Sequence, residues 1–103
     1  MLIEIRRYTL EPGRRAEFVR WFENEVRPAM EAAGIAILGS FESVDDPDAF
    51  VYMRGFDNEQ QRGRLTAAFH SGEVWLGGMR ERALEMEVGY EVEVVRSTPG
   101  SAI

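Results

Sequence analysis

The sequence contains no cysteine and no lysine, and His70 is its only histidine. The absence of cysteine excludes a disulfide framework, a thiolate nucleophile, a zinc ribbon and an iron–sulfur centre. A histidine-based metal site is not expected, since the chain offers one imidazole and no thiolate. The acidic stretch Asp45, Asp46 and Asp48 is typical of a turn. We therefore predict no metal site and no cofactor.

The chain also lacks excess positive charge and any long apolar run. Eighteen acidic and twelve basic residues give a net charge of −6, which argues against binding to nucleic-acid phosphates. No segment approaches the roughly 18 apolar residues that span a bilayer. The first residues, MLIEIRRYTL, carry charge from position 4, so we expect neither a signal nor a transit peptide. We predict a cytoplasmic protein without nucleic-acid or membrane partners.

With 103 residues, 45% of them hydrophobic, the chain is expected to form one globular domain. That domain covers 1–103, and 97–103 are predicted to be a loose tail. Residues 2–10 alternate as a strand does, and a helix is predicted from Gly13 to about Ala33.

Local signals divide the rest of the chain. Pro28 should kink the last turns of the first helix, and Gly34 should end it. Asp57 and Gln60 have the spacing of a capping box at the start of the next helix. The sequence His-Ser-Gly after Phe69 should break that helix. The remaining predicted elements are strands at 35–44, 50–56 and 87–96 and helical segments at 57–69 and 75–86.

The order of these elements is strand, helix, strand, strand, helix, strand. This βαββαβ order predicts an α+β, ferredoxin-like fold. Short connections and right-handed crossovers place the first and third strands in the centre of an antiparallel four-stranded sheet, with the helices on one face.

Alternation along the strands predicts which residues share a face of the sheet. The apolar set that starts with Ile3 and Ile5 is expected to face the helices, which leaves a charged and aromatic set on the opposite face. A second copy of the chain is the simplest cover for such a face, so we predict a homodimer, sheet against sheet, with a polar cavity. The first set also contains Val51, Met53, Gly55, Val88, Tyr90, Val92 and Val94. The second contains Glu4, Arg6, Tyr8, Phe50, Tyr52, Arg54, Phe56, Glu91 and Glu93.

The charges on that second face have two compatible interpretations. In one, Arg6 and Arg54 pair with carboxylates across the strands and fix their register. In the other, the same arginines hold an anionic or carbonyl-bearing small molecule. The predicted catalytic residues are Arg54, His70 and Tyr8. The predicted ligand-binding residues are Arg6, Tyr52, Glu4, Phe56 and Trp75.

His70 and the two tryptophans each have a structural and a functional interpretation. His70 follows Phe69 near a helix end, where imidazole satisfies free carbonyls without any catalytic role. Alternatively, it is a general base, a proton shuttle or a haem ligand. Trp75 lies on an apolar stripe and is expected to pack in the core. Trp21 lies off the main stripe of the first helix and is expected to be half exposed at a dimer rim or cavity mouth.

A set of motif positions recurs in order and spacing over residues 2 to about 96: Glu4, Arg6, Tyr8, Pro12, Gly13, Gly34, Gly39, Phe41, Phe56, Asp57, Arg62 and Trp75. Together these positions resemble the pattern of the NIPSNAP family. The resemblance implies a dimeric α+β barrel, an architecture shared with antibiotic-biosynthesis-type monooxygenases and EthD-like proteins, and it implies little about chemistry.

These observations predict a homodimer that binds a small organic molecule in a polar and aromatic cavity. One interpretation is a cofactor-independent oxygenase or isomerase, in which Arg6 and Arg54 orient a carbonyl or carboxylate. Tyr8 and Tyr52 would then donate hydrogen bonds, and a glutamate or His70 would move a proton. The alternative is a non-catalytic dimeric interaction module. A third, minor interpretation is haem binding through His70.

Overall fold

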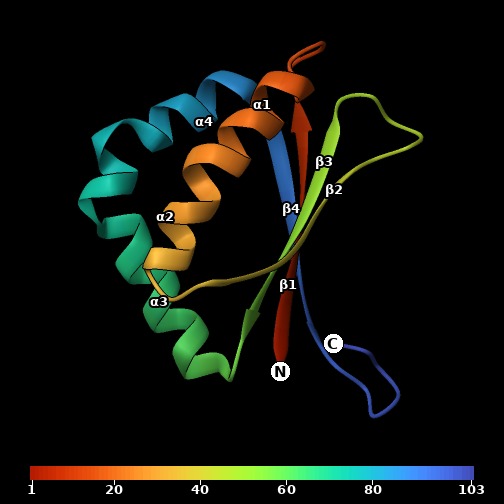
Figure 1. The fold of residues 1–103 in the computed structure, drawn as a ribbon, viewed down its shortest axis with the longest axis vertical. Coiled ribbons are helices and arrows are strands. Elements are labelled where there is room, and N and C mark those ends of the chain that lie inside the picture. The colour runs from red at the N-terminus through yellow and green to blue at the C-terminus, as the bar shows by residue number, and fades with distance from the viewer.

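The computed structural model describes residues 1–103 and confirms the α+β, ferredoxin-like fold. All of the helical elements lie along one face of a single four-stranded sheet, and the other face has no helical cover (Figure 1). No helix is both long enough and apolar enough to cross a membrane. The elements are β1 (Leu2–Leu10), α1 (Arg15–Trp21), η1 (Phe22–Val26), α2 (Arg27–Ala32), β2 (Ala36–Glu42), β3 (Ala49–Phe56), α3 (Glu59–Ser71), η2 (Trp75–Met79), α4 (Arg80–Met86) and β4 (Glu87–Arg96).

The sheet has the strand order β2-β3-β1-β4, and all three pairings are antiparallel. The first and third strands are therefore central, as predicted. β1 pairs with β3 so that Glu4 lies opposite Arg54, and with β4 so that Tyr8 lies opposite Tyr90. This register brings side chains from the two ends of the sequence onto one face of the sheet.

The prediction of which face the helices cover was wrong for β1 and β3. The charged and aromatic set lies beneath the helices: the Tyr8 ring is 6.0 Å from Phe18 of α1, and the Tyr52 ring is 4.7 Å from Phe22 of η1. The set led by Ile3 and Ile5 faces the opposite side. The prediction failed because it assumed that the more apolar set would be covered, whereas aromatic rings and paired charges fill this core.

The prediction of which residues face the helices was correct for part of β4. Tyr90, Val92 and Val94 lie opposite Tyr8, Arg6 and Glu4 and share the helical side, so Glu91 and Glu93 share the other. The helices do not extend over this edge strand, because Tyr90, Val92 and Val94 remain between 38% and 59% exposed.

The first helical region runs from α1 through η1 to α2 and contains one irregularity. A π-helical turn, η1, precedes Pro28, which lies in the first turn of α2. Pro28 has no backbone N–H to donate to the preceding turn, so the helix adjusts there. The predicted kink thus takes the form of a wider turn. Gly34 follows the helix at a φ of +88°, a conformation that favours glycine, and ends it as predicted.

The start of α3 differs by one residue from the predicted capping box. Asn58, not Asp57, is the N-cap: its Oδ1 accepts a hydrogen bond from the Gln61 backbone N–H at 2.8 Å. The Gln61 side chain in turn accepts from the Asp57 backbone N–H at 2.6 Å. The helix also continues through His70 to Ser71 before Gly72 ends it. Asparagine is at least as good a cap as aspartate, so the sequence alone did not separate the two.

The uncovered face of the sheet is largely apolar. Leu38 packs over Gly55, and the ring of Phe41 lies over Gly39, where a Cβ atom would come within 2.6 Å of that ring. Phe41 itself remains 49% exposed. Ile5, Val51, Met53 and Val95 are partly exposed on the same side, which we call the outer face.

Candidate ligand-binding cavity

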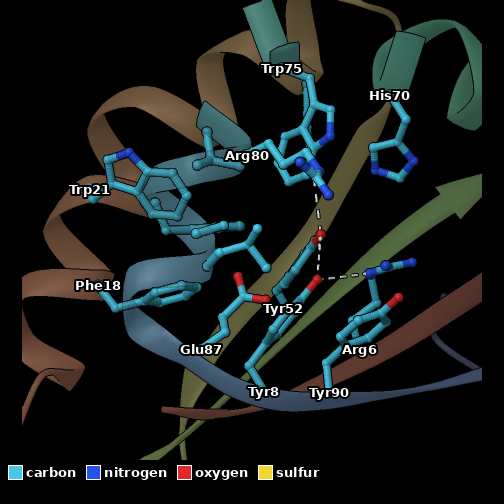
Figure 2. Close-up of a pocket in the computed structure, with 15 residues that line it drawn as sticks. Arg6, Tyr8, Phe18, Trp21, Tyr52, His70, Trp75, Arg80, Glu87 and Tyr90 are labelled. Atoms are coloured by element: carbon cyan, nitrogen blue, oxygen red, sulfur yellow. Dashed lines mark hydrogen bonds between the residues drawn. The ribbon is translucent and has the colours of Figure 1, made fainter. Parts of the chain in front are cut away.

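A cavity of about 300 Å³ lies between the helical side of the sheet and the overlying helices. This volume is at the lower end of the range typical of small-molecule sites. Figure 2 shows the lining side chains converging from β1, β3 and β4 and from the helices above them. They are Arg6, Tyr8, Phe18, Trp21, Phe22, Val26, Met30, Tyr52, His70, Trp75, Arg80, Ala83, Leu84, Glu87 and Tyr90.

One end of the cavity is aromatic and aliphatic. Phe18 and Trp21 pack edge to face with ring centroids 5.4 Å apart, and Phe22, Val26 and Met30 complete this wall from the same helical region. Trp21 is only 8% exposed, so the prediction that it would be half exposed was wrong, although it does lie at the cavity. The wall suits the flat, apolar body of a ligand.

The other end is polar and is organised by a chain of hydrogen bonds. Arg6 Nε donates to the Tyr8 hydroxyl at 3.1 Å, and the hydroxyls of Tyr8 and Tyr52 lie 3.5 Å apart (Figure 2). The two tyrosine rings stack with centroids 5.7 Å apart. Burial and the neighbouring Tyr8 raise the pKa of the Tyr52 hydroxyl, so it remains protonated and able to donate. These groups can donate to a carbonyl or carboxylate oxygen.

Beneath Arg6 lies an ion cluster centred on Glu4, which is 1% exposed. Arg6 Nη1 donates to Glu4 Oε1 at 2.7 Å, and Arg54 Nε donates to the same oxygen at 2.8 Å. Arg62 of α3 donates to the second oxygen, Oε2, at 2.7 Å. Burial raises the pKa of the Glu4 carboxyl, but Arg54 and Arg6 together outweigh it and leave that pKa below its usual value. One buried carboxylate thus holds three guanidinium groups in place.

Three predicted site residues belong to this cluster rather than to the cavity lining. Arg54 is fully buried, with its guanidinium carbon 5.7 Å from the centre of the Phe56 ring, and its Nη1 has no hydrogen-bond partner. Neither Arg54, Phe56 nor Glu4 lines the cavity. The cross-strand pairing interpretation therefore describes Arg54 and Glu4, while Arg6 is both paired and open to the cavity.

The remaining predicted residues do line the cavity: Tyr8, Arg6, Tyr52, His70 and Trp75. His70 lies in the last turn of α3, with its ring centre 5.2 Å from that of Trp75. Burial lowers the pKa of His70, and the charges of Arg54 and Arg6 lower it further. The imidazole is therefore neutral at neutral pH and can act as a hydrogen-bonding group of the polar end.

Sequence reasoning missed two charged residues of the lining, Arg80 and Glu87. Both come from the last helical segment and the start of β4, and Leu84 lies between them. Arg80 and Leu84 have the spacing of one helical face, whereas Glu87 already belongs to β4, so no local signal placed it at the cavity. Burial raises the pKa of the Glu87 carboxyl to about 7, an effect that Arg6 only partly offsets. Glu87 therefore exchanges protons near neutral pH.

A NIPSNAP family model matches residues 3–101, so the chain belongs to the NIPSNAP family. No curated protein matches the sequence. Among solved structures, protein Atu4242 from Agrobacterium tumefaciens is 20% identical with a TM-score of 0.91, over 100% of this chain and 99% of that one. An uncharacterized NIPSNAP domain protein from Burkholderia xenovorans is 15% identical with a TM-score of 0.91, over 100% of both chains.

A more distant similarity in fold extends to another class of protein. A structure described as an antibiotic biosynthesis monooxygenase is 14% identical to this chain with a TM-score of 0.70, and the match covers 96% of this chain and 100% of that one. At this identity the similarity is one of fold. The fold class and family given by the sequence motifs are both confirmed.

Proposed function

We propose that this NIPSNAP protein binds a small aromatic compound that carries a carbonyl or carboxylate group. The observation that carries this proposal is the division of one cavity into two ends. The hydrogen-bonded Arg6, Tyr8 and Tyr52 face one end, and the aromatic wall around Phe18 and Phe22 forms the other. A ligand of this class satisfies both ends at once.

The charge balance around the polar end favours an anionic or electron-rich oxygen. Three arginines share the single carboxylate of Glu4, and Arg80 adds a further guanidinium at the cavity. This local positive charge lies within a protein whose net charge is −6. Guanidinium groups bind carboxylates and stabilise enolates through charge-assisted hydrogen bonds, which are stronger than neutral ones.

The same arrangement supports a cofactor-independent isomerase or oxygenase. When a carbonyl compound loses a proton from the neighbouring carbon, negative charge develops on the carbonyl oxygen, and Arg6 with the tyrosine hydroxyls would stabilise it there. An isomerase returns the proton, whereas an oxygenase exposes the resulting anion to molecular oxygen. The resemblance in fold to an antibiotic biosynthesis monooxygenase is consistent with either chemistry.

The outer face supports the second part of the proposal, a homodimer. Its apolar side chains include Phe41, Val51 and Met53, and no element of the chain covers them. Arg7 lies opposite Glu91 on this same face, so the surface carries both charge signs and can complement a copy of itself. The dimer would bury the outer face and leave each cavity beneath its own helices. If the cavity binds nothing, this face alone would make the protein a non-catalytic interaction module.

The two tryptophans of the chain, Trp21 and Trp75, both line the cavity, so their fluorescence reports its occupancy. We would titrate the protein with phenylpyruvate, which joins a phenyl ring to a ketone and a carboxylate. Saturable quenching is expected, and Arg6→Gln should weaken binding by about 10-fold or more. The matched control is Arg64→Gln, an exposed arginine of α3. Absence of saturable binding by the unmodified protein would contradict the proposal.

A further inference from the structure

Glu87 is the one carboxylate among the residues that line the cavity. It begins β4, directly after α4 ends at Met86, and its carboxylate makes no hydrogen bond or salt bridge within the chain. Figure 2 shows that this carboxylate points into the cavity, between Phe18 on one side and the two tyrosines on the other. A carboxylate that is partly buried among aromatic side chains and left unpaired is costly for the fold, so a structural role does not explain it.

Glu87 lies between the aromatic wall of the cavity and its polar end. A ligand whose carbonyl oxygen binds Arg6, Tyr8 and Tyr52, and whose ring packs on the aromatic wall, has its intervening carbon next to Glu87. That carbon is the acidic one in an aryl-substituted ketone, because both neighbours stabilise the anion left when it loses a proton. In this arrangement the donors Arg6, Tyr8 and Tyr52 bind the carbonyl oxygen of the ligand. Glu87 lies next to the carbon that carries the acidic proton.

We propose that Glu87 is the catalytic base that removes, and then returns, a proton at the carbon between a carbonyl and an aromatic group. This inference rests on the proposed binding function and identifies the substrate class as enolisable arylmethyl ketones. A Glu87 oxygen takes the proton as the C–H bond breaks. The C–H electron pair forms the new C=C bond, and the carbonyl π pair moves to oxygen, where Arg6 and the tyrosine hydroxyls bind the enolate. Return of the proton to carbon restores the ketone and the carboxylate, so no oxidant is consumed.

His70 is the other candidate for this role, and its surroundings disfavour it. Burial, and then the charges of Arg54 and Arg6, oppose the positive charge that His70 would gain as a base and lower its pKa. Glu87 instead becomes neutral when it takes the proton, which suits a partly buried site. Its carboxyl pKa of about 7 is also close to the value at which a general base is most effective at neutral pH.

The test follows hydrogen exchange in phenylpyruvate dissolved in D₂O, by proton NMR of its methylene group, with tryptophan quenching measured on the same samples. The unmodified protein should exchange the methylene hydrogens faster than buffer alone. Glu87→Gln should bind the probe with the same affinity and reduce the protein-dependent exchange rate by about 100-fold. Glu81→Gln, an exposed neighbour on α4, is the matched control and should leave exchange unchanged. His70→Gln should reduce the exchange rate far less than Glu87→Gln does.

Three results would overturn the inference. Binding of the probe without exchange by the unmodified protein removes the catalytic role of Glu87 and leaves the binding proposal standing. Full exchange by Glu87→Gln, or its loss only in His70→Gln, assigns the base elsewhere. If the unmodified protein neither binds the probe nor exchanges it, the inference and the binding proposal both fail.

Discussion

Glu4 and Arg54 lie directly opposite each other on β1 and β3, with Arg54 Nη2 2.6 Å from Glu4 Oε1. Neither side chain is more than 2% exposed. Arg6 donates hydrogen bonds both to the Glu4 carboxylate and to the Tyr8 hydroxyl. Arg62 of α3 donates to the same carboxylate. The pair therefore positions the polar end of the cavity and connects it to a helix. Arg54 does not line the cavity, so it would affect a bound ligand only through Glu4 and Arg6.

Removing either member of this pair should destabilise the fold. Arg54→Met removes one of the three guanidinium groups around Glu4, and Glu4→Gln leaves Arg6 and Arg54 without a carboxylate, while Arg62 keeps Glu59. Each should lower the free energy of unfolding by about 3–5 kcal/mol, the usual cost of breaking a buried ion pair. Urea denaturation followed by circular dichroism measures this change.

The double variant Glu4→Gln, Arg54→Met tests whether the two side chains stabilise the fold together. In the double variant neither Glu4 nor Arg54 is left as a buried charge without its partner, so the combined loss should be smaller than the sum of the two single losses. Arg64→Met on the exposed side of α3 is the control and should change stability little. Additive losses would show that the two side chains act independently.

The stability of the protein should depend on the ionisation of Glu87. Its carboxyl pKa is raised from 4.5 to about 7 in the folded state, where it faces Arg6, Arg80, His70, Tyr8 and Tyr52 across the cavity. Between these values the folded chain holds a proton that the unfolded chain has lost, so this group reduces stability as the pH rises from 4.5 through about 7.

Glu87→Gln removes that contribution. Relative to the unmodified protein it should be more stable at pH 8 by about 1–2 kcal/mol, once solvent screening is allowed for, with a smaller difference at pH 5. Contributions of other groups, including His70, are present in both proteins and cancel in the comparison. Thermal unfolding at several pH values gives the difference. A difference that does not change with pH would mean that the Glu87 pKa is not raised.

The start of α3 should depend on Asn58. Asn58→Ala removes the side-chain oxygen that accepts from the Gln61 backbone N–H, and should cost about 1 kcal/mol. Gln60→Ala, one residue before the residue that completes the cap, should have little effect. Equal effects of the two substitutions, measured by urea denaturation, would argue against this cap.

Self-association should depend on the outer face. Met53→Glu places a charge on the central strand β3, on the side away from the helices, and should convert a dimer into a monomer. Val44→Glu, at a fully exposed position in the β2–β3 connection, is the control and should remain dimeric. Native mass spectrometry reports both states. A monomeric unmodified protein would contradict the proposed assembly.

Hydrophobic periodicity and turn residues are local signals, so they predicted the order of elements. Rules for connecting strands then predicted the strand order, and the resemblance in motifs predicted the family. β1 and β4 were placed at their observed ends, Leu2–Leu10 and Glu87–Arg96. The covered face of the sheet was not predicted, because alternation tells which residues share a face and not which face is buried. Here Ile3 and Ile5 lie on the outer face, where Ile3 is nevertheless buried, while Glu4 and Arg6 lie beneath the helices as a buried ion pair.

The cavity could be predicted only in part for the same reason. Tyr8, Arg6 and Tyr52 stood out because charge and aromatic residues alternate along two strands. Glu87 did not, since nothing in its local sequence indicates that α4 and β4 turn its carboxylate toward Tyr52 rather than into solvent. The raised pKa of Glu87 arises from that tertiary burial.

The most direct test of the account is a crystal structure of the protein with phenylpyruvate bound. We expect the phenyl ring against Phe18 and Phe22, the ketone or carboxylate oxygens within hydrogen-bond distance of Arg6 and the Tyr8 and Tyr52 hydroxyls, and the methylene carbon next to Glu87. The account is contradicted if the probe lies outside the cavity, or if its ring lies among the tyrosines and its carboxylate against the aromatic wall.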